Sequence, residues 1–434
     1  MAGTLSRRSF VKSSLAAAAA AQTVGRRVYG ANERARLGFI GVANRGGQLI
    51  TATRPHEDAE IVAVCDVYRP AMEQWREKLP GAVDLYGDYR RLLERDDIDG
   101  VVIATPDHWH ALQTVDACDA GKDVFIEKPL SMTVHEGRRM VEAARRNKRI
   151  VQVGLQRRSG EMFHELAEFL KGGSIGKVTV AHCHRITNMT PDGMGRAQPS
   201  EPPEGLDWDM WLGPRAYRPY QDNITPYKFR WWKEYSSQIG NWGVHYFDLI
   251  RWLLGEDAPV SVVALGGQYA VDDDRTIPDT MQAVFEFASG RLLVFSQYEA
   301  NGAPVFAVRG DIELRGTLGT LYAGDRGYQV VPERGGQFQD AAPRMEPVKT
   351  EARSPNADLT VLHMRNFLDC IKSRAKPNSD VEDGHRSTIF SHLGNIALET
   401  RSRIDWDPKT ERITNHEATN ALLHYEYRAP WELR

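Results

Sequence analysis

The stretch that decides the fold is VVIATPDHWHALQTVDACDAGKDVFIEKPL, residues 101–130. Two apolar runs with β character, 101–104 and 124–126, flank a helix-like segment that ends at Gly121. This order predicts a β-α-β unit of a parallel sheet. Polar residues follow each run, and ligands of open α/β sheets bind outside the carboxyl ends of the strands. Lys128 is therefore a candidate for chemistry, and a plain surface lysine is the alternative.

Upstream, RLGFIGVANRGGQLI (residues 36–50) predicts a strand, a glycine turn and the start of a helix. The turn has the form G-x-G-x-x-G with alanine at the middle glycine. The first glycine permits the tight turn, the last permits close packing of helix on strand, and the N–H groups at the helix start bind pyrophosphate. The residues predicted to contact the dinucleotide here are Gly41, Ala43, Asn44, Arg45 and Gly46.

A second apolar run, residues 61–65, leads to Asp66. This is near the spacing of the carboxylate that accepts a hydrogen bond from the ribose 2′-OH of NAD. Asp66 favours NAD because it would repel the 2′-phosphate of NADP, although Arg69 could pair with that phosphate. NAD is the expected cofactor, and NADP is the alternative.

The chain as a whole has 434 residues, enough for two or three domains. Its net charge of −3 gives no indication of nucleic-acid or anionic-membrane binding. The four cysteines are scattered, with no CxxC or Cys/His cluster, so no metal site is predicted. After the N-terminus, no apolar run reaches the length of a membrane span.

Residues 1–31 are predicted to be an export signal. SRRSFVK (residues 6–12) is a twin-arginine motif, and a mildly apolar, alanine-rich stretch follows it. A disordered basic tail is the alternative. Because the twin-arginine (Tat) pathway exports folded proteins, we expect the Tat machinery as a partner and a periplasmic or otherwise exported protein.

Four motifs, GFIGVANRG, VCDV, IATPDHWHA and EKPLS, resemble those of the Gfo/Idh/MocA oxidoreductases. The resemblance continues through VQVGLQRRS, LDWDMWLGP, GNWGVHYFDLIRWLLG and HLGNIALETR, so it covers nearly everything after the export signal. It implies an α/β protein with a Rossmann domain at 34–154. A substrate-binding and oligomerisation domain at 155–434 would follow. Successive apolar runs joined by short turns indicate that the second domain has a mostly antiparallel open sheet.

The resemblance also implies a catalytic pair. Lys128 matches the lysine of EKP and would donate to, or relay a proton from, the reacting hydroxyl. His245 matches the histidine of the D-x-G-x-H motif and would serve as general acid/base. Asn241 replaces the aspartate that opens this motif, and an amide can position a hydroxyl but cannot take a proton.

Further ligand contacts are expected at strand ends and in the second domain. The other residues expected to contact the cofactor are Thr105, Pro106, His108, His110 and Glu127, together with Lys128. Those expected to contact substrate are Arg157, Asn241, Asp248 and Trp232. Ion pairing remains the alternative for Arg157 and Asp248. Trp232 belongs to an aromatic-rich excursion, residues 187–238, which should roof the site or contact a neighbouring subunit.

Three functions fit these residues. The leading one is an NAD(P)-dependent oxidoreductase acting on a carbohydrate, either a sugar or a polyol, and assembled as a homo-oligomer through the C-terminal sheet. Its cofactor would be held tightly, because no dinucleotide pool recycles it after export. The alternative is a redox-neutral glycoside hydrolase that oxidises, eliminates, hydrates and reduces. A non-catalytic sugar-binding protein is third, and the intact glycine turn with Lys128 and His245 argues against it.

Overall fold

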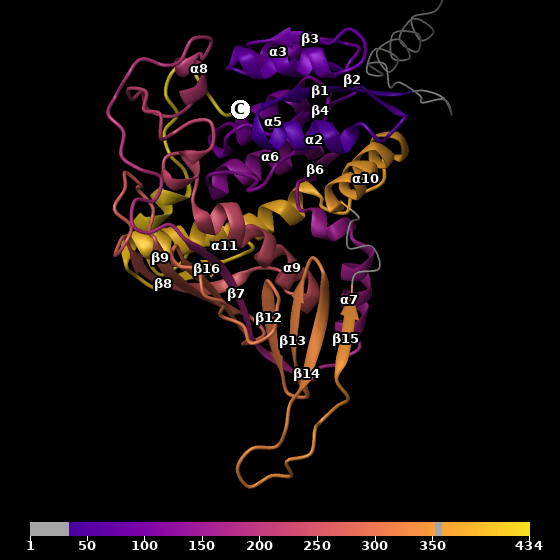
Figure 1. Ribbon diagram of the computed structural model, residues 1–434, viewed down its shortest axis with the longest axis vertical. Helices are drawn as coiled ribbons and strands as arrows, with labels where there is room; N and C mark the ends of the chain where they lie inside the picture. The colour runs from indigo at the N-terminus through magenta and orange to yellow at the C-terminus, as the bar shows by residue number, and fades with distance from the viewer. Residues whose placement is uncertain (1–33, 352–357) are drawn as a thin grey trace, which may run out of the picture. The chain divides into compact units, whose positions relative to one another are not determined.

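The computed structural model describes residues 34–351 and 358–434. The predicted export signal lies outside these residues. Over the described ranges the chain forms a six-stranded sheet followed by an eleven-stranded sheet (Figure 1). None of the helices within these ranges is long and apolar enough to cross a membrane.

The first sheet is parallel throughout, in the order β3-β2-β1-β4-β5-β6. Its strands are β1 (Ala35–Ile40), β2 (Ala59–Cys65), β3 (Asp84–Tyr86), β4 (Gly100–Ile103), β5 (Asp123–Ile126) and β6 (Val151–Val153). The connecting α-helices are α2 (Asn44–Thr53), α3 (Arg69–Lys78), α4 (Tyr89–Leu93), α5 (His110–Asp119) and α6 (Val134–Arg146). Because helices cover both faces, β4 and β5 are fully buried and read as unbroken apolar runs. The predicted β-α-β unit is β4-α5-β5.

Strand order reverses between β1 and β4, which pair side by side although two strands separate them in sequence. In open α/β sheets ligands bind at such a reversal, outside the carboxyl ends of the strands. The glycine turn follows β1, and the short helix η1 (Asp107–Trp109) follows β4. Both therefore lie at the edge where a dinucleotide is expected.

The second sheet has the order β15-β14-β13-β12-β7-β10-β9-β8-β16-β17, with β11 paired to β7. Its strands are β7 (Val178–Asn188), β8 (Pro259–Gly267), β9 (Thr280–Phe287), β10 (Leu292–Tyr298), β11 (Ala300–Asn301), β12 (Ile312–Gly316), β13 (Gly319–Gly324), β14 (Gly327–Pro332), β15 (Val348–Glu351), β16 (Ile404–Asp407) and β17 (Arg412–Ile413). Among these strands β7 and β10 pair in parallel and the other recorded pairs are antiparallel, which confirms the predicted sheet type.

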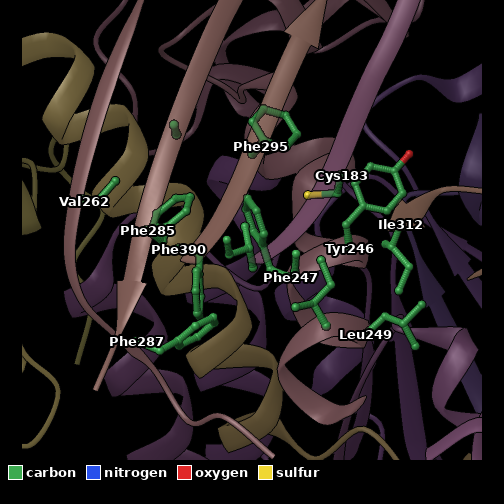
Figure 2. Packing of buried hydrophobic residues seen from close by; sticks show 14 of the residues in the cluster. Cys183, Tyr246, Phe247, Leu249, Val262, Phe285, Phe287, Phe295, Ile312 and Phe390 are labelled. Carbon is green, nitrogen blue, oxygen red and sulfur yellow. The ribbon is translucent and has the colours of Figure 1, made fainter. Parts of the chain in front are cut away.

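Helices pack on one face of this sheet. They include α7 (Glu161–Lys171), α9 (Val244–Leu254) and α11 (Val381–Thr400), while α10 (Leu359–Ser373) packs on α2. In the core between sheet and helices, Phe247 of α9 stacks on Phe390 of α11 with ring centroids 5.4 Å apart, and Phe285 of β9 meets both rings (Figure 2). Because α11 also packs against α6 and β6, one helix joins the two sheets.

The aromatic-rich excursion has little regular structure besides α8 (Trp208–Leu212) and η3 (Lys228–Trp231). Its rings form a core of their own, in which Trp208 stacks on Trp211 at 4.7 Å between centroids. Figure 1 shows this segment in magenta beside the violet half that holds the first sheet. The excursion is therefore a folded lobe, because it buries its own aromatic side chains.

The last residues described, which follow η5 (Glu417–Leu423), join the excursion to the first sheet. Trp431 meets Trp109 edge-on, with centroids 4.8 Å apart. The Tyr427 hydroxyl donates to Glu136 of α6 at 2.6 Å, and Arg428 Nε donates to the carbonyl of Gly213 at 3.0 Å. We call residues 424–434 the tail; it ties the excursion to the half of the chain that forms the first sheet.

Candidate active site

The glycine turn has the geometry of a dinucleotide cradle. Gly41 lies in the left-handed region at φ +79°, and a Cβ added there would lie 2.8 Å from the Thr105 nitrogen. A Cβ on Gly46 would lie 1.9 Å from the Gly41 carbonyl oxygen, so no side chain fits where α2 crosses β1. Ala43, at the middle position of the motif, is the N-cap of α2. The N–H groups that begin α2 are thus left open toward the turn, where they can bind pyrophosphate.

A cavity of about 320 Å³ lies beside this turn. The predicted cofactor residues that line it are Gly41, Ala43, Asn44, Arg45, Asp66, Thr105 and Pro106. Asp66 accepts hydrogen bonds from the backbone N–H groups of Val42 at 2.8 Å and Tyr68 at 2.9 Å. Burial raises the pKa of Asp66, although these donors oppose the shift. The carboxylate of Asp66 is thus oriented beside the cavity, as a ribose-binding group requires.

The opposite wall of this cavity is the excursion, which therefore takes the first of its two expected roles and roofs the site. The roof residues are Pro203, Leu206, Met210, Trp211, Tyr220, Thr225, Pro226, Phe229 and Arg230. Most of these side chains are apolar or aromatic, as in cofactor sites generally. A cradle without room for a Cβ, an oriented carboxylate and an apolar roof together fit NAD.

Lys128 leaves the carboxyl end of β5, and its ammonium is held by a single residue. Lys128 Nζ donates to the Asn241 backbone oxygen at 2.9 Å and to Asn241 Oδ1 at 2.8 Å. An ammonium has three N–H donors, so one remains for a substrate oxygen. Burial lowers the pKa of Lys128 to about 8; the charge of Glu127 opposes the shift, and that of Arg230 adds to it. A pKa this close to neutrality suits proton transfer.

His245 comes from the second half of the chain. The π-helical turn η4 (Ile239–Gly243) carries Asn241 and runs directly into α9, where His245 is the second residue. Such turns are frequent at functional sites. Burial lowers the pKa of His245 well below its usual value, and the charges of Lys128 and Arg157 lower it further. The imidazole is therefore neutral at pH 7 and close enough to Lys128 for its charge to act.

Glu127 precedes Lys128 at the end of β5 and pairs with Arg45 of the glycine turn. Its Oε1 accepts from Arg45 Nε at 2.7 Å, and a Cβ on Gly154 would lie 2.8 Å from its carboxylate. Burial alone would raise the pKa of Glu127, but the charges of Arg45 and Lys128 outweigh it and hold that pKa below its ordinary value. The ion pair ties the glycine turn to the end of β5. Glu127 thus orients its neighbours and does not line the cofactor cavity.

His108 and His110, both expected to contact the cofactor, have internal hydrogen-bond partners. His108 is fully buried, with Nε2 2.9 Å from the Trp211 carbonyl oxygen, and burial lowers its pKa to about 3. His110 has its ring nitrogens 3.0 Å from the Thr105 oxygen and 2.8 Å from the Pro129 oxygen. His110 therefore ties together the segments that follow β4 and β5, behind the cavity.

Arg157 and Asp248, both expected to contact substrate, instead have internal ionic partners. Asp248 is 2% exposed and accepts from Arg158 Nε at 2.8 Å and from the Ser387 hydroxyl at 2.8 Å. Arg157 donates to Asp325 Oδ1 at 2.8 Å and also pairs with Asp311. The ion-pairing alternative is therefore the better description of both.

Trp232, expected to contact substrate, is likewise an internal residue. It is 4% exposed, Nε1 donates to the Asn223 carbonyl oxygen at 3.0 Å, and Arg218 lies over its ring at 4.3 Å. Its role is to hold the excursion together. Of the four predicted substrate residues, Asn241 alone binds a member of the catalytic pair.

The sequence interpretation missed Arg230, which lines the cavity from the roof. It also missed the fully buried ion pairs of Arg275 with Asp273 and Glu299, which brace the base of the excursion. The excursion has no periodicity, so nothing in the sequence separated Arg230 from the other arginines there. The sequence interpretation also missed the tail, because the tail has no periodicity either.

Comparison with known proteins gives two family matches. The Gfo/Idh/MocA model, an oxidoreductase family with an NAD-binding Rossmann fold, matches residues 35–155. The model of that family's C-terminal alpha/beta domain matches residues 173–309 and 336–433.

Individual relatives and structures add detail. Myo-inositol 2-dehydrogenase of Thermotoga maritima is 25% identical over 386 residues, covering 85% of this chain and 98% of its own length. Alpha-N-acetylgalactosaminidase of Shewanella oneidensis is 36% identical over 125 residues, 27% of each chain. The structure of aldose-aldose oxidoreductase from Caulobacter crescentus, complexed with glycerol, superposes with a TM-score of 0.64 at 16% identity. That superposition covers 86% of this chain and all of the other.

Proposed function

Because this chain belongs to the Gfo/Idh/MocA oxidoreductase family, we propose that it moves a hydride to or from a hydroxyl-bearing carbon of a sugar or polyol. It is an NAD-dependent oxidoreductase acting on CH–OH groups. One observation carries the proposal: Lys128 has a lowered pKa and is held by Asn241, with His245 nearby, at the sheet edge that also forms the dinucleotide cradle. Myo-inositol 2-dehydrogenase, matched over most of its length, supports a polyol or sugar substrate.

When bound, NAD supplies the hydride acceptor in oxidation and the hydride donor in reduction. In oxidation, the neutral amine of Lys128 takes the proton of the reacting hydroxyl. Two N–H groups of that amine point at the Asn241 oxygens, so its lone pair is left for the hydroxyl. In reduction, the ammonium returns the proton and stabilises the negative charge that develops on the carbonyl oxygen. His245, neutral at pH 7, accepts a hydrogen bond from a substrate hydroxyl and so orients the substrate.

The roof supports a tightly held cofactor, because a dinucleotide in this cavity would be enclosed between the glycine turn and the excursion. The twin-arginine motif motivates the accompanying proposal of export. Mass spectrometry of protein purified from its native host should find bound NAD(H) or NADP(H). A screen of sugars and polyols should then find one that reduces the bound cofactor. Recovery of cofactor-free protein that binds no dinucleotide in calorimetry would refute the proposal.

A redox-neutral glycosidase remains the second candidate. The observation that favours it is the local likeness to an alpha-N-acetylgalactosaminidase. Incubation with aryl glycosides distinguishes the two reactions. The glycosidase would release the aryl alcohol with no net change in NADH, whereas the oxidoreductase would leave the glycosides intact.

We also propose that copies of the chain assemble through the second sheet. Its strand β8 presents Val263 and Leu265, 43% and 76% exposed, on the face opposite the helices. Exposed apolar side chains on a sheet commonly mark an interface. Light scattering should show an oligomer for the intact protein. Leu265→Arg should reduce it to a smaller species with the same cofactor content; an unchanged mass would contradict assembly through this face.

A further inference from the structure

Arg230 is the cation that the roof presents to the cavity. Its guanidinium carbon lies 4.3 Å from the Tyr227 ring centroid and 4.5 Å from that of Phe229. Nη1 donates to the Tyr227 carbonyl oxygen at 3.0 Å. Stacking and one hydrogen bond thus hold the guanidinium from behind and leave most of its five donors available.

Within the described residues Arg230 differs from the neighbouring arginines in its salt bridges. No ion pair of Arg230 is recorded among residues 34–351 and 358–434, whereas the cavity's other arginine, Arg45, is paired with Glu127 at 2.7 Å. Arg157, which acts on His245, is paired as well. A partly buried arginine without a salt-bridge partner has lost part of its hydration, and an anionic ligand would compensate that loss.

The charge of Arg230 lies at the catalytic end of the site. It acts on Lys128 and on Asp107, the residue that opens η1 after β4. The charge of Arg230 lowers the pKa of Lys128 more than the charge of Arg45 does. Arg230 shares the cavity lining with Thr105 and Pro106, which follow β4 and precede Asp107. An anion bound by Arg230 would therefore lie near the reacting carbon.

We propose that Arg230 determines the substrate class by binding the carboxylate of a sugar acid whose reacting hydroxyl lies against Lys128. The inference rests on the function proposed above and makes it more specific. A planar guanidinium matches a carboxylate with two parallel hydrogen bonds, so substitution by lysine would lose the fork while keeping the charge. The other oxyanion that could lie in the cavity is the pyrophosphate of the dinucleotide, and the experiment separates the two.

The test is calorimetry on the cofactor-loaded protein. The probes are D-glucuronate, D-galacturonate and D-gluconate, each against its neutral counterpart D-glucose, D-galactose or D-glucitol. At least one acid should bind roughly ten- to a hundredfold more tightly than its counterpart, as expected for hydrogen bonds to a charged group. Arg230→Gln should remove this preference and Arg230→Lys should keep part of it. Lys233→Gln, at an exposed position of the excursion, should leave it unchanged.

A second readout uses pH. Because the Arg230 charge lowers the pKa of Lys128, Arg230→Gln should move the pH dependence of sugar-acid oxidation to higher pH. This shift reports the Arg230 charge beside Lys128 and should appear with neutral substrates as well, so the acid preference itself is read from the calorimetry.

Three results would overturn the inference. The first is that the neutral compounds bind as tightly as the acids. The second is that none of the acids binds. The third is that the Arg230→Gln variant loses the dinucleotide and keeps the acid preference. The last would assign Arg230 to the pyrophosphate. A loaded enzyme that oxidises neutral sugars alone would leave the proposed function intact while this inference fails, and cofactor-free, inert protein would refute the function itself.

Discussion

Lys128 is the residue on which the proposed chemistry depends. Replacing it with methionine keeps the bulk of the side chain but removes the proton donor, so kcat should fall by about two to four orders of magnitude. Because the pKa of Lys128 is about 8, the amine that accepts a proton is scarce below that pH. Oxidation by the parent enzyme should therefore reach half its maximal rate at a pH of about 8 and level off above that pH. Steady-state kinetics across this range, with bound cofactor quantified, measures both; a Lys128→Met enzyme with near-normal kcat would remove Lys128 from the mechanism.

Asn241 offers a second test at the same atoms. Asn241→Asp would place a carboxylate 2.8 Å from Lys128 Nζ in place of the amide oxygen. A negative charge stabilises the ammonium and raises the pKa of Lys128, so the rise in oxidation rate should shift to higher pH. Asn241→Ala, which keeps the backbone acceptor alone, serves as the control for lost positioning. An unshifted pH profile in the aspartate variant would show that Lys128 is not the titrating group.

At this scale the sequence predicts residues that lie in motifs and fails for those defined by distant partners. Lys128, His245 and the glycine turn stand at fixed spacings from a predicted strand or helix. Asp248 looked equally suitable, but its role follows from Arg158, which is 90 positions away in the chain. Nothing local could show that pairing. Arg230 was missed because it reaches the cavity only when the excursion folds over residues that are distant in the chain.

At the scale of elements, the junction of β1, the turn and α2 is the most sensitive to small changes. Gly46→Ala would put a methyl group 1.9 Å from the Gly41 carbonyl oxygen. Helix α2 must then move, and its first N–H groups no longer point toward the pyrophosphate site. We expect dinucleotide affinity to fall at least tenfold, which corresponds to about 1.4 kcal/mol. Calorimetric titration with NAD measures it. Gly336→Ala, where no atom lies within 4 Å of the added methyl group, is the matched control and should bind NAD normally; equal affinities for both variants would contradict the cradle.

Elements were predictable where hydrophobic periodicity was strong. The helix from Val244 to Leu254 and the β4-α5-β5 unit follow directly from such patterns. Residues 305–314 are rich in apolar residues, but strand β12 begins only at Ile312, because the chain before it is largely exposed and unpaired in the sheet. The π-helical turn η4 could not be anticipated, since its sequence continues the apolar face of an ordinary helix.

For the whole molecule, the tail controls how firmly the roof is held. Trp431 packs on Trp109, which itself lines the cavity. The Arg90 guanidinium lies over the Trp431 ring, 5.0 Å from its centroid. Trp431→Ala removes this contact and should accelerate loss of the dinucleotide, with a smaller effect on kcat. Repeated desalting followed by measurement of bound cofactor detects the change. Phe338→Ala, at a side chain 94% exposed, is the matched control; equal retention by the two variants would show that the tail does not secure the roof.

The two walls of the cavity come from segments far apart in the chain, near residues 41–113 and 203–230. A chimaera made by exchanging residues 34–154 with those of a relative would combine one protein's cradle with another's roof. Cofactor preference should therefore not transfer cleanly with the nucleotide-binding half alone. Over evolutionary time, gene recombination within this architecture would be constrained to exchange both segments together, so the natural module is the enclosed site and not the domain.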